Sequence, residues 1–223
     1  MVNVDDVYQR VLTLANKEQR GYITPQEFNL LANLAQKEIF EQYFYDLNQY
    51  LRIPGNSEEY SDMVDLLQEK IAIFERVGAL APGGTISGDV YRLGTVILNG
   101  REVQEIQQNE FLYINNSPLV KPTASSPVYV RTGENTIQVY PVVTTGVTYT
   151  YIQVPSNAAW GYDVVGTDAL YNAAKSVDFE LHASDESELV NRILTLAGIS
   201  IQRLDVAQAA IQLEATKQQI EKR

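Results

Sequence analysis

The side chains that could perform acid–base or nucleophilic chemistry are few, because the chain has one histidine and no cysteine. A metal site needs further ligands at suitable spacing around His182, and a serine nucleophile needs a context such as Gly-x-Ser-x-Gly. Neither pattern is present in the sequence. We therefore interpret His182, between a predicted strand and a predicted helix, as a structural residue.

Residues 78–85, Gly-Ala-Leu-Ala-Pro-Gly-Gly-Thr, have the glycine spacing of a phosphate-binding loop. However, Gly84 stands where the lysine that contacts the β- and γ-phosphates is required. The segment also follows a predicted helix and leads toward predicted strands, which reverses the strand–loop–helix order of such loops. We interpret it as a flexible linker between two modules.

Three pairs of neighbouring carboxylates are the remaining candidates for catalysis: Asp5-Asp6, Glu58-Glu59 and Asp185-Glu186. Each pair lies at the predicted start of a helix, where the helix dipole stabilises negative charge. That position accounts for the pairs without acid–base chemistry. The sequence therefore predicts no enzyme activity, no catalytic residue, no metal and no cofactor. A lytic enzyme, with a glycosidase-type pair assembled only in three dimensions, stays open as an alternative.

Charge and hydropathy limit the partners of this 223-residue chain. It carries 17 basic and 28 acidic residues, a net charge of −11. Gripping nucleic acid requires clustered Lys and Arg, and no segment is basic. The acidic surface keeps the particle soluble, or it forms the wall of a channel through which DNA slides; both interpretations stay open. Without a signal-peptide pattern or an apolar run of roughly 18 to 20 residues, we expect synthesis in the cytoplasm and no membrane partner.

Residues 1–77 show helical periodicity, with apolar residues three and four positions apart. The strongest start signal belongs to the second predicted helix: Thr24 caps it, Pro25 fits its first position, and Glu27 completes a capping box. That helix runs to about Arg52 and is roughly 42 Å long at 1.5 Å per residue. One compact core needs less, so part of it is expected to meet another element or another subunit.

Residues 78–182 are predicted to form a β-rich module. Asn99-Gly100 lies between extended runs, and it is the strongest short hairpin signal because both residues tolerate positive φ. A second hairpin is predicted around residues 133–135, and a further strand at 147–152. The pattern indicates an antiparallel meander with one face in water.

Residues 183–223 are again predicted to be helical and to complete a bundle with residues 1–77. The last helix, 205–223, has high helix propensity but sparse apolar positions, so it either frays or docks in a groove on a partner. The expected fold class is α+β: a helical bundle from both ends of the chain, an inserted antiparallel β module, and a long, protruding C-terminal helix.

Three groups of segments resemble a virion structural protein family of crAss-like phages and related marine short-tailed phages. The groups are residues 21–29 with 44–46; residues 96–103 with 113–119 and 127–130; and residues 176–182 with 188–190 and 196–201. Together they span most of the chain. They are packing motifs, so they indicate a family more strongly than a role.

The resemblance implies a non-enzymatic ring or adaptor subunit of the head-to-tail connector, placed beneath the portal and lining the DNA exit path. Its implied partners are the portal protein, neighbouring tail or ring proteins and further copies of itself, in a ring of twelve. Genomic DNA would pass through the ring without sequence-specific binding. The implied location is the portal–tail junction of the virion, after assembly in the host cytoplasm.

Adaptors of this kind usually insert a long C-terminal helix against the portal. By that resemblance, the portal-docking residues are Val206, Ala210, Leu213, Lys217 and Ile220. The inserted β module departs from the simplest helical adaptors. The alternative is therefore another virion component, a tail or head-surface protein whose β module binds a receptor or the capsid.

Overall fold

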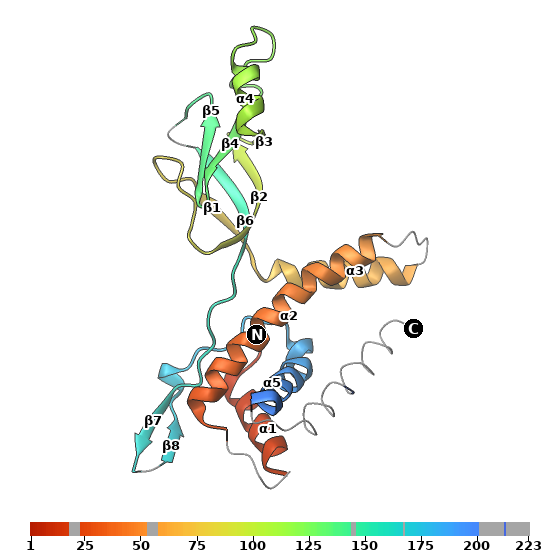
Figure 1. Cartoon of the computed structure of the whole chain (residues 1–223), viewed down its shortest axis with the longest axis vertical. Helices are drawn as coiled ribbons and strands as arrows, with labels where there is room; N and C mark the ends of the chain where they lie inside the picture. Colours follow the sequence, from red (N-terminus) through yellow and green to blue (C-terminus); the bar gives the residue numbers. More distant parts are fainter. Residues whose placement is uncertain (18–22, 53–57, 144–145, 167, 201–211, 213–223) are drawn as a thin grey trace. The chain divides into compact units, whose positions relative to one another are not determined.

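The computed structural model describes residues 1–17, 23–52, 58–143, 146–166, 168–200 and 212, and it divides into two compact units (Figure 1). Unit 1 comprises Met1–Ile73 and Pro155–Arg223, and unit 2 comprises Phe74–Val154. The chain re-enters unit 1 at Pro155, whereas sequence periodicity placed the end of the β-rich zone at residue 182.

Unit 1 contains the helices α1 (Val4–Lys17), α2 (Pro25–Arg52), α3 (Glu58–Ala72) and α5 (Glu186–Ser200). The helix α2 packs against α3 and α5, and α5 packs against α1. The predicted capping box is confirmed: the Thr24 N–H donates to Glu27 Oε2 at 3.0 Å, and the Glu27 N–H donates to Thr24 Oγ1 at 3.3 Å. The bonds that Thr24 donates lower the pKa of the Glu27 carboxyl.

One side of α2 is covered by an extended segment, residues 156–160. Three side chains of α2, Gln36, Asn33 and Asn29, bond the main chain of residues 156, 158 and 160 in turn; they are termed the amide ladder. Asn33 and Asn29 each accept an N–H at 2.8 Å and donate to the C=O of the same residue, at 2.9 and 3.3 Å. Gln36 Nε2 donates to the C=O of residue 156 at 2.7 Å. Asn29 and Asn33 are four helical residues apart, a rise of about 6.0 Å, and their partners are two extended residues apart, about 6.6 Å, so these two spacings match.

The other edge of the extended segment pairs with the chain that precedes α5. Ala159 and Val177 exchange two main-chain hydrogen bonds, at 2.9 and 2.8 Å. Val2 and Phe179 form a second bridge of the same kind, at 3.3 and 3.1 Å. The N-terminus and residues 156–179 are thereby joined through their main chains, and the side chains of the amide ladder join them to α2.

A hairpin of β7 (Tyr162–Val165) and β8 (Asp168–Tyr171) follows the extended segment. Its base is anchored by the buried Trp160, whose ring centroid lies 4.3 Å from that of Tyr8 in α1. The indole N–H donates to Asp5 Oδ1 at 2.9 Å. The indole ring also lies against Tyr162 of β7 and Tyr171 of β8, with ring centroids 5.8 and 5.7 Å away. Since an isolated hairpin is marginally stable in water, these ring contacts help to hold β7 and β8 on unit 1.

Unit 2 is a six-stranded sheet in the order β1-β6-β2-β3-β4-β5. Its elements are β1 (Glu75–Ala79), β2 (Val90–Leu98), β3 (Arg101–Glu105), α4 (Gln108–Asn115), β4 (Val128–Gly133), β5 (Thr136–Tyr140) and β6 (Val147–Gln153). The predicted hairpin at Asn99-Gly100 is confirmed, with φ of 50° and 78° at the two turn residues. The hairpin predicted around residues 133–135 is confirmed as the β4–β5 pair.

The expected fold class, a helical bundle with an inserted antiparallel β module and a long C-terminal helix, is wrong, although its α+β part fits partly. The sheet is mixed, because β3 and β4 are parallel. A parallel pair needs a crossover of a dozen or more residues, and α4 with its flanking loops supplies one. Unit 1 is no plain bundle, because the amide ladder holds extended chain against α2. Residues 205–223, apart from Gln212, lie outside the described residues.

The loop between β1 and β2, residues 80–86, connects the two sides of the sheet and is termed the strap. At one end the Leu80 N–H donates to the Val147 C=O of β6, at 3.0 Å. Farther along, the Ile137 N–H of the edge strand β5 donates to the Gly84 C=O, at 2.8 Å. The strap therefore pairs with an edge of the sheet that would otherwise present open main-chain groups.

The segment that resembles a phosphate-binding loop, residues 78–85, comprises the end of β1 and most of this strap and lies inside unit 2, so its interpretation as a linker between modules is wrong. Gly83 and Gly84 have φ of +91° and +81°, in the region that favours glycine. A Cβ added at Gly84 would lie 2.0 Å from the Ile137 carbonyl oxygen, whereas at Gly83 it would meet no atom within 4 Å. Glycine at position 84 is required by close approach to β5.

We expect Gly84→Ala to destabilise the protein more than Gly83→Ala. Both substitutions incur the strain of positive φ, about 1–2 kcal/mol, but only the first forces the strap away from β5. The additional loss should be about 1–3 kcal/mol, as for other overpacked sites. Urea unfolding followed by circular dichroism would measure both, and equal losses would contradict the close contact.

We expect Asn33→Ala to lower the free energy of unfolding by about 2–4 kcal/mol, because the N–H and C=O of the buried Ala158 lose their partners. The matched control is Asn48→Ala on the same helix. Asn48 is exposed and donates only to the Phe44 C=O one turn earlier, so its loss should stay within about 0.5 kcal/mol. Similar losses for both variants would show that the amide ladder does not stabilise unit 1.

Candidate functional site

The single histidine, His182, caps the short 3₁₀ helix η2 (Ala183–Asp185). Its Nδ1 accepts the Ser184 N–H at 3.2 Å and lies 2.8 Å from Ser184 Oγ. Asp185 contacts the serine, at 3.3 Å, whereas in a catalytic triad the carboxylate contacts the imidazole. The capping role agrees with the structural interpretation of His182.

Asp185 belongs to a buried polar cluster that its place at a helix start did not reveal. It is 2% exposed, and its two carboxylate oxygens accept from Lys70 Nζ and from the Tyr43 hydroxyl, each at 2.7 Å. Burial and the bond to Asp185 raise the pKa of Tyr43 well above its usual value. The cluster joins η2, α2 and α3 through groups 115 and 142 residues apart in sequence, so it stabilises unit 1.

We expect Lys70→Ala to cost about 3–5 kcal/mol of unfolding free energy, because it leaves the buried Asp185 without its cation. Lys175→Ala is the matched control, since Lys175 pairs with the half-exposed Asp163 at the surface. Exposed pairs contribute about 0–1 kcal/mol. Chemical unfolding at neutral pH would compare the two variants. An equally small loss for Lys70→Ala would mean that the cluster is not sealed from water.

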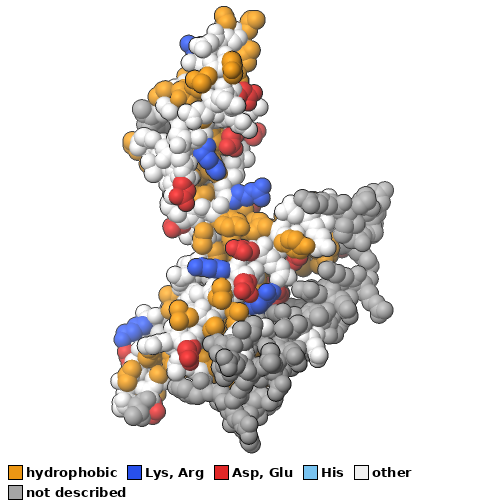
Figure 2. Space-filling view, in the orientation of Figure 1, with side chains coloured by type: hydrophobic (Ala, Val, Ile, Leu, Met, Phe, Trp, Pro, Cys, Tyr) orange, Lys and Arg blue, Asp and Glu red, His pale blue; other side chains and the backbone are white. Residues whose placement is uncertain are grey.

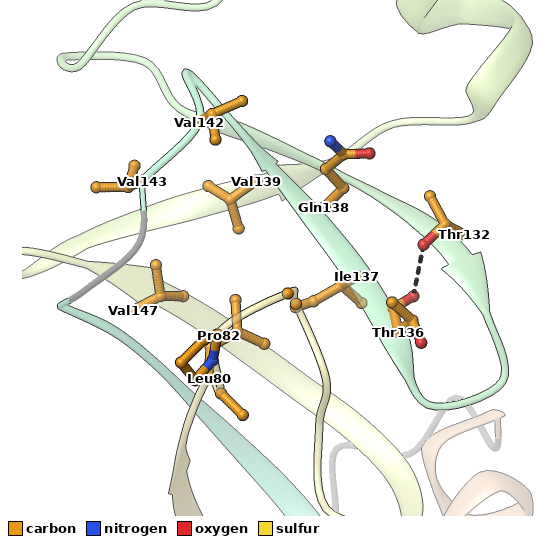
Figure 3. Close-up of a pocket in the computed structure, with 13 residues that line it drawn as sticks. Leu80, Pro82, Thr132, Thr136, Ile137, Gln138, Val139, Val142, Val143 and Val147 are labelled. Carbon is orange, nitrogen blue, oxygen red and sulfur yellow. Dashed lines mark hydrogen bonds between the residues drawn. The ribbon is translucent and has the colours of Figure 1, made fainter.

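A pocket of about 250 Å³, lined by both apolar and polar groups, lies between the strap and the strands β5 and β6 (Figure 3). Ile137 and Val147 form part of its wall and belong to the buried core of unit 2. Figure 3 shows Leu80 and Pro82 of the strap beside them, and Val142, which is 71% exposed, lies at the rim. Among the described residues that line the pocket there is no Asp, Glu, Lys or Arg.

Unit 2 also carries an exposed apolar projection, residues 112–121, termed the tip. Its large apolar side chains are highly exposed: Leu112 62%, Tyr113 81%, Leu119 97% and Val120 60%. Figure 2 shows hydrophobic side chains gathered at the end of unit 2 that α4 forms. Exposed apolar side chains that are close together in this way are typical of interaction sites on proteins.

The tip is held in a defined conformation. On the opposite face of α4, Phe111 is buried and stacks on Tyr140 of β5, with ring centroids 4.0 Å apart. Beyond the helix, the Ser117 N–H donates to the Ile114 C=O at 3.1 Å, and the Lys121 N–H donates to the Ser117 C=O at 3.2 Å. A surface that is ordered before binding loses less conformational entropy when it binds.

The portal-docking residues expected from the sequence, Val206, Ala210, Leu213, Lys217 and Ile220, lie outside the described residues. Sequence reasoning missed both the tip and the pocket. The tip had one signal, the apolar pair Leu119-Val120 between Pro118 and Pro122, where a surface loop is usually polar. The pocket had none, because its walls come from distant strands.

In the part of the chain that the structure describes, no group of three or more His, Asp or Glu residues is placed to hold a metal ion. No helix among the described residues has the length and apolar character needed to span a bilayer.

The chain matches no known protein-family model. No curated protein matches it either.

Proposed function

We propose that this chain is a non-enzymatic structural protein of a phage virion. In this proposal it forms a homo-oligomeric ring of the head-to-tail connector, beneath the portal and along the path by which DNA leaves. The observation that carries the proposal is the exposed and ordered tip of unit 2. Leu112, Tyr113, Leu119 and Val120 are all more than half exposed within ten residues, and apolar side chains grouped in this way are typical of surfaces that bind a partner.

Surface charge supports the same role. A net charge of −11 repels DNA, which suits a wall that DNA slides past without being gripped. The proposal that the particle is a phage virion rests on the segments that resemble structural proteins of crAss-like phages. Part of that resemblance lies in α4 and the tip themselves, through residues 113–119. On the sequence alone, the proposal assigns the portal contact to Val206, Ala210, Leu213, Lys217 and Ile220.

Electron cryomicroscopy of intact virions tests this proposal most directly. We expect the chain at the head–tail junction, in a closed ring of twelve copies, and native mass spectrometry of the purified chain should give the same stoichiometry. Deleting residues 206–223 should leave a folded chain that no longer joins portal-containing particles.

Other outcomes would overturn the proposal in distinct ways. Density on the head surface or at the tail end would favour the second candidate, in which unit 2 and its tip bind the capsid or a receptor. Turnover of peptidoglycan that is lost when a single carboxylate is substituted would show an enzyme. A truncated chain that still assembles would remove the assigned portal contact.

A further inference from the structure

We infer that residues 206–223 dock in a groove of their own chain, between the helices α1 and α5, and that they leave it to bind the portal. The groove belongs to unit 1, and residues 201–223 follow directly on α5, which ends at Ser200. The contact within the chain stands on its own, whereas the portal as its competitor rests on the proposed function. The free chain thereby covers the residues that it later uses for assembly.

The groove is a hollow of about 430 Å³ where α1 and α5 pack side by side (Figure 1). Two apolar side chains line it: Val190 of α5 is buried, and Leu14 of α1 is 43% exposed. The other described residues that line it are polar: Gln9, Arg10 and Thr13 of α1, and Ser187 and Asn191 of α5. Side chains three and four residues apart form ridges on a helix, and another helix packs into the groove between such ridges.

The segment has an apolar stripe of the width that such a groove accepts. The positions of the stripe alternate steps of four and three residues, and one of them is a lysine: Val206, Ala210, Leu213, Lys217 and Ile220. On a helix this spacing gives a narrow seam, as in a coiled coil. Gln212, which the structure describes, is helical and exposed, and it lies off the stripe, as docking through the stripe requires.

The length of the connection places the stripe beside the groove. Residues 201–205 give a connection of about five residues, within the range of about 2–8 that joins helices, and connections this short join antiparallel neighbours. A helix that begins at Val206 then runs back along α5 at about 1.5 Å per residue. Asn191 lies about nine residues before the end of α5, so the helix reaches its level at about residue 215, between Leu213 and Lys217.

Charge and connectivity favour this segment as the occupant. Residues 206–223 contain three basic and two acidic residues, whereas residues 1–205 contain 14 basic and 26 acidic residues. The segment is thus a slightly basic part of an acidic chain, and Coulomb attraction draws it toward the rest of the molecule. The short connection also holds it at an effective concentration of about 1 mM, so it occupies its own groove before that of a second copy.

Cysteine pairs in the full-length chain test the contact, because the natural sequence has no cysteine. Asn191→Cys combined with Leu213→Cys, or with Lys217→Cys one turn later, should form an intramolecular disulfide under mild oxidation. The product should migrate as a compact monomer, in a yield that does not change with protein concentration. The matched control combines Asn191→Cys with Ile211→Cys, which should stay reduced because residue 211 lies about 160° around the helix from Leu213.

Three outcomes of the cross-linking would overturn the inference. If neither pair forms a disulfide, the segment does not lie beside α5. If disulfide-linked dimers form in a yield that rises with concentration, the groove receives the segment of a second copy. If the control cross-links equally, the segment does not dock through the stripe.

Limited proteolysis of the full-length chain gives an independent measurement, because trypsin cleaves after Lys217. Leu14→Asp places a carboxylate in the groove, so the segment should be released. Cleavage after Lys217 should then be about tenfold faster, since proteolysis follows the population of the open form. The control Leu34→Asp alters a leucine of α2 that is 47% exposed and does not line the groove. Equal cleavage rates in the two variants would contradict the docking.

The two proposals fail separately. A chain locked by the disulfide should not join portal-containing particles until the disulfide is reduced. A locked chain that still joins them would overturn the release and the portal contact assigned to this segment, and would leave the groove contact standing. A chain that forms no disulfide, yet occupies the head–tail junction, would overturn the groove contact and leave the connector proposal standing.

Discussion

The fold depends on one constraint, that main-chain N–H and C=O groups removed from water must find hydrogen-bond partners. Both units place irregular chain against a buried surface, where regular pairing is absent. In unit 1 the amide ladder of α2 acts as the neighbouring strand for residues 156–160. In unit 2 the strap, residues 80–86, pairs with the edge strand β5. Without the amide ladder, the main-chain groups of the buried Ala158 and Trp160 would be unpaired, at about 1–3 kcal/mol each.

The pocket and the tip of unit 2 follow from that constraint and from the connections of the sheet. The strap must run close to β5 to be paired, so the space between them becomes a pocket walled by core residues. The crossover that makes β3 and β4 parallel must pass beyond the sheet, and it carries the tip out into solvent. Both surfaces are therefore consequences of how the sheet is connected and closed.

Burial sorts the polar residues of the chain into two roles. Asp185 is buried and accepts hydrogen bonds from Lys70 and Tyr43, so these three side chains join η2, α3 and α2. Most other carboxylates stay in water and give the chain its net charge of −11. Against that acidic background, the described residues that line the pocket carry no charge, and the tip carries a single lysine.

The sequence by itself determined the features whose energetics lie within a few residues. The capping box of Thr24 and Glu27 and the turn at Asn99-Gly100 are local, so propensity and spacing were enough to predict them. The tertiary structure alone decided the mixed sheet, the amide ladder and the pocket, whose partners lie far apart in sequence; Asn33 and Ala158, for example, are separated by 125 residues. The stability of such a contact comes from burial shared by both partners, and neither partner's own sequence records it. Gly84 shows the difference: its type suggested a flexible linker, and only the carbonyl of Ile137 revealed why glycine is needed there.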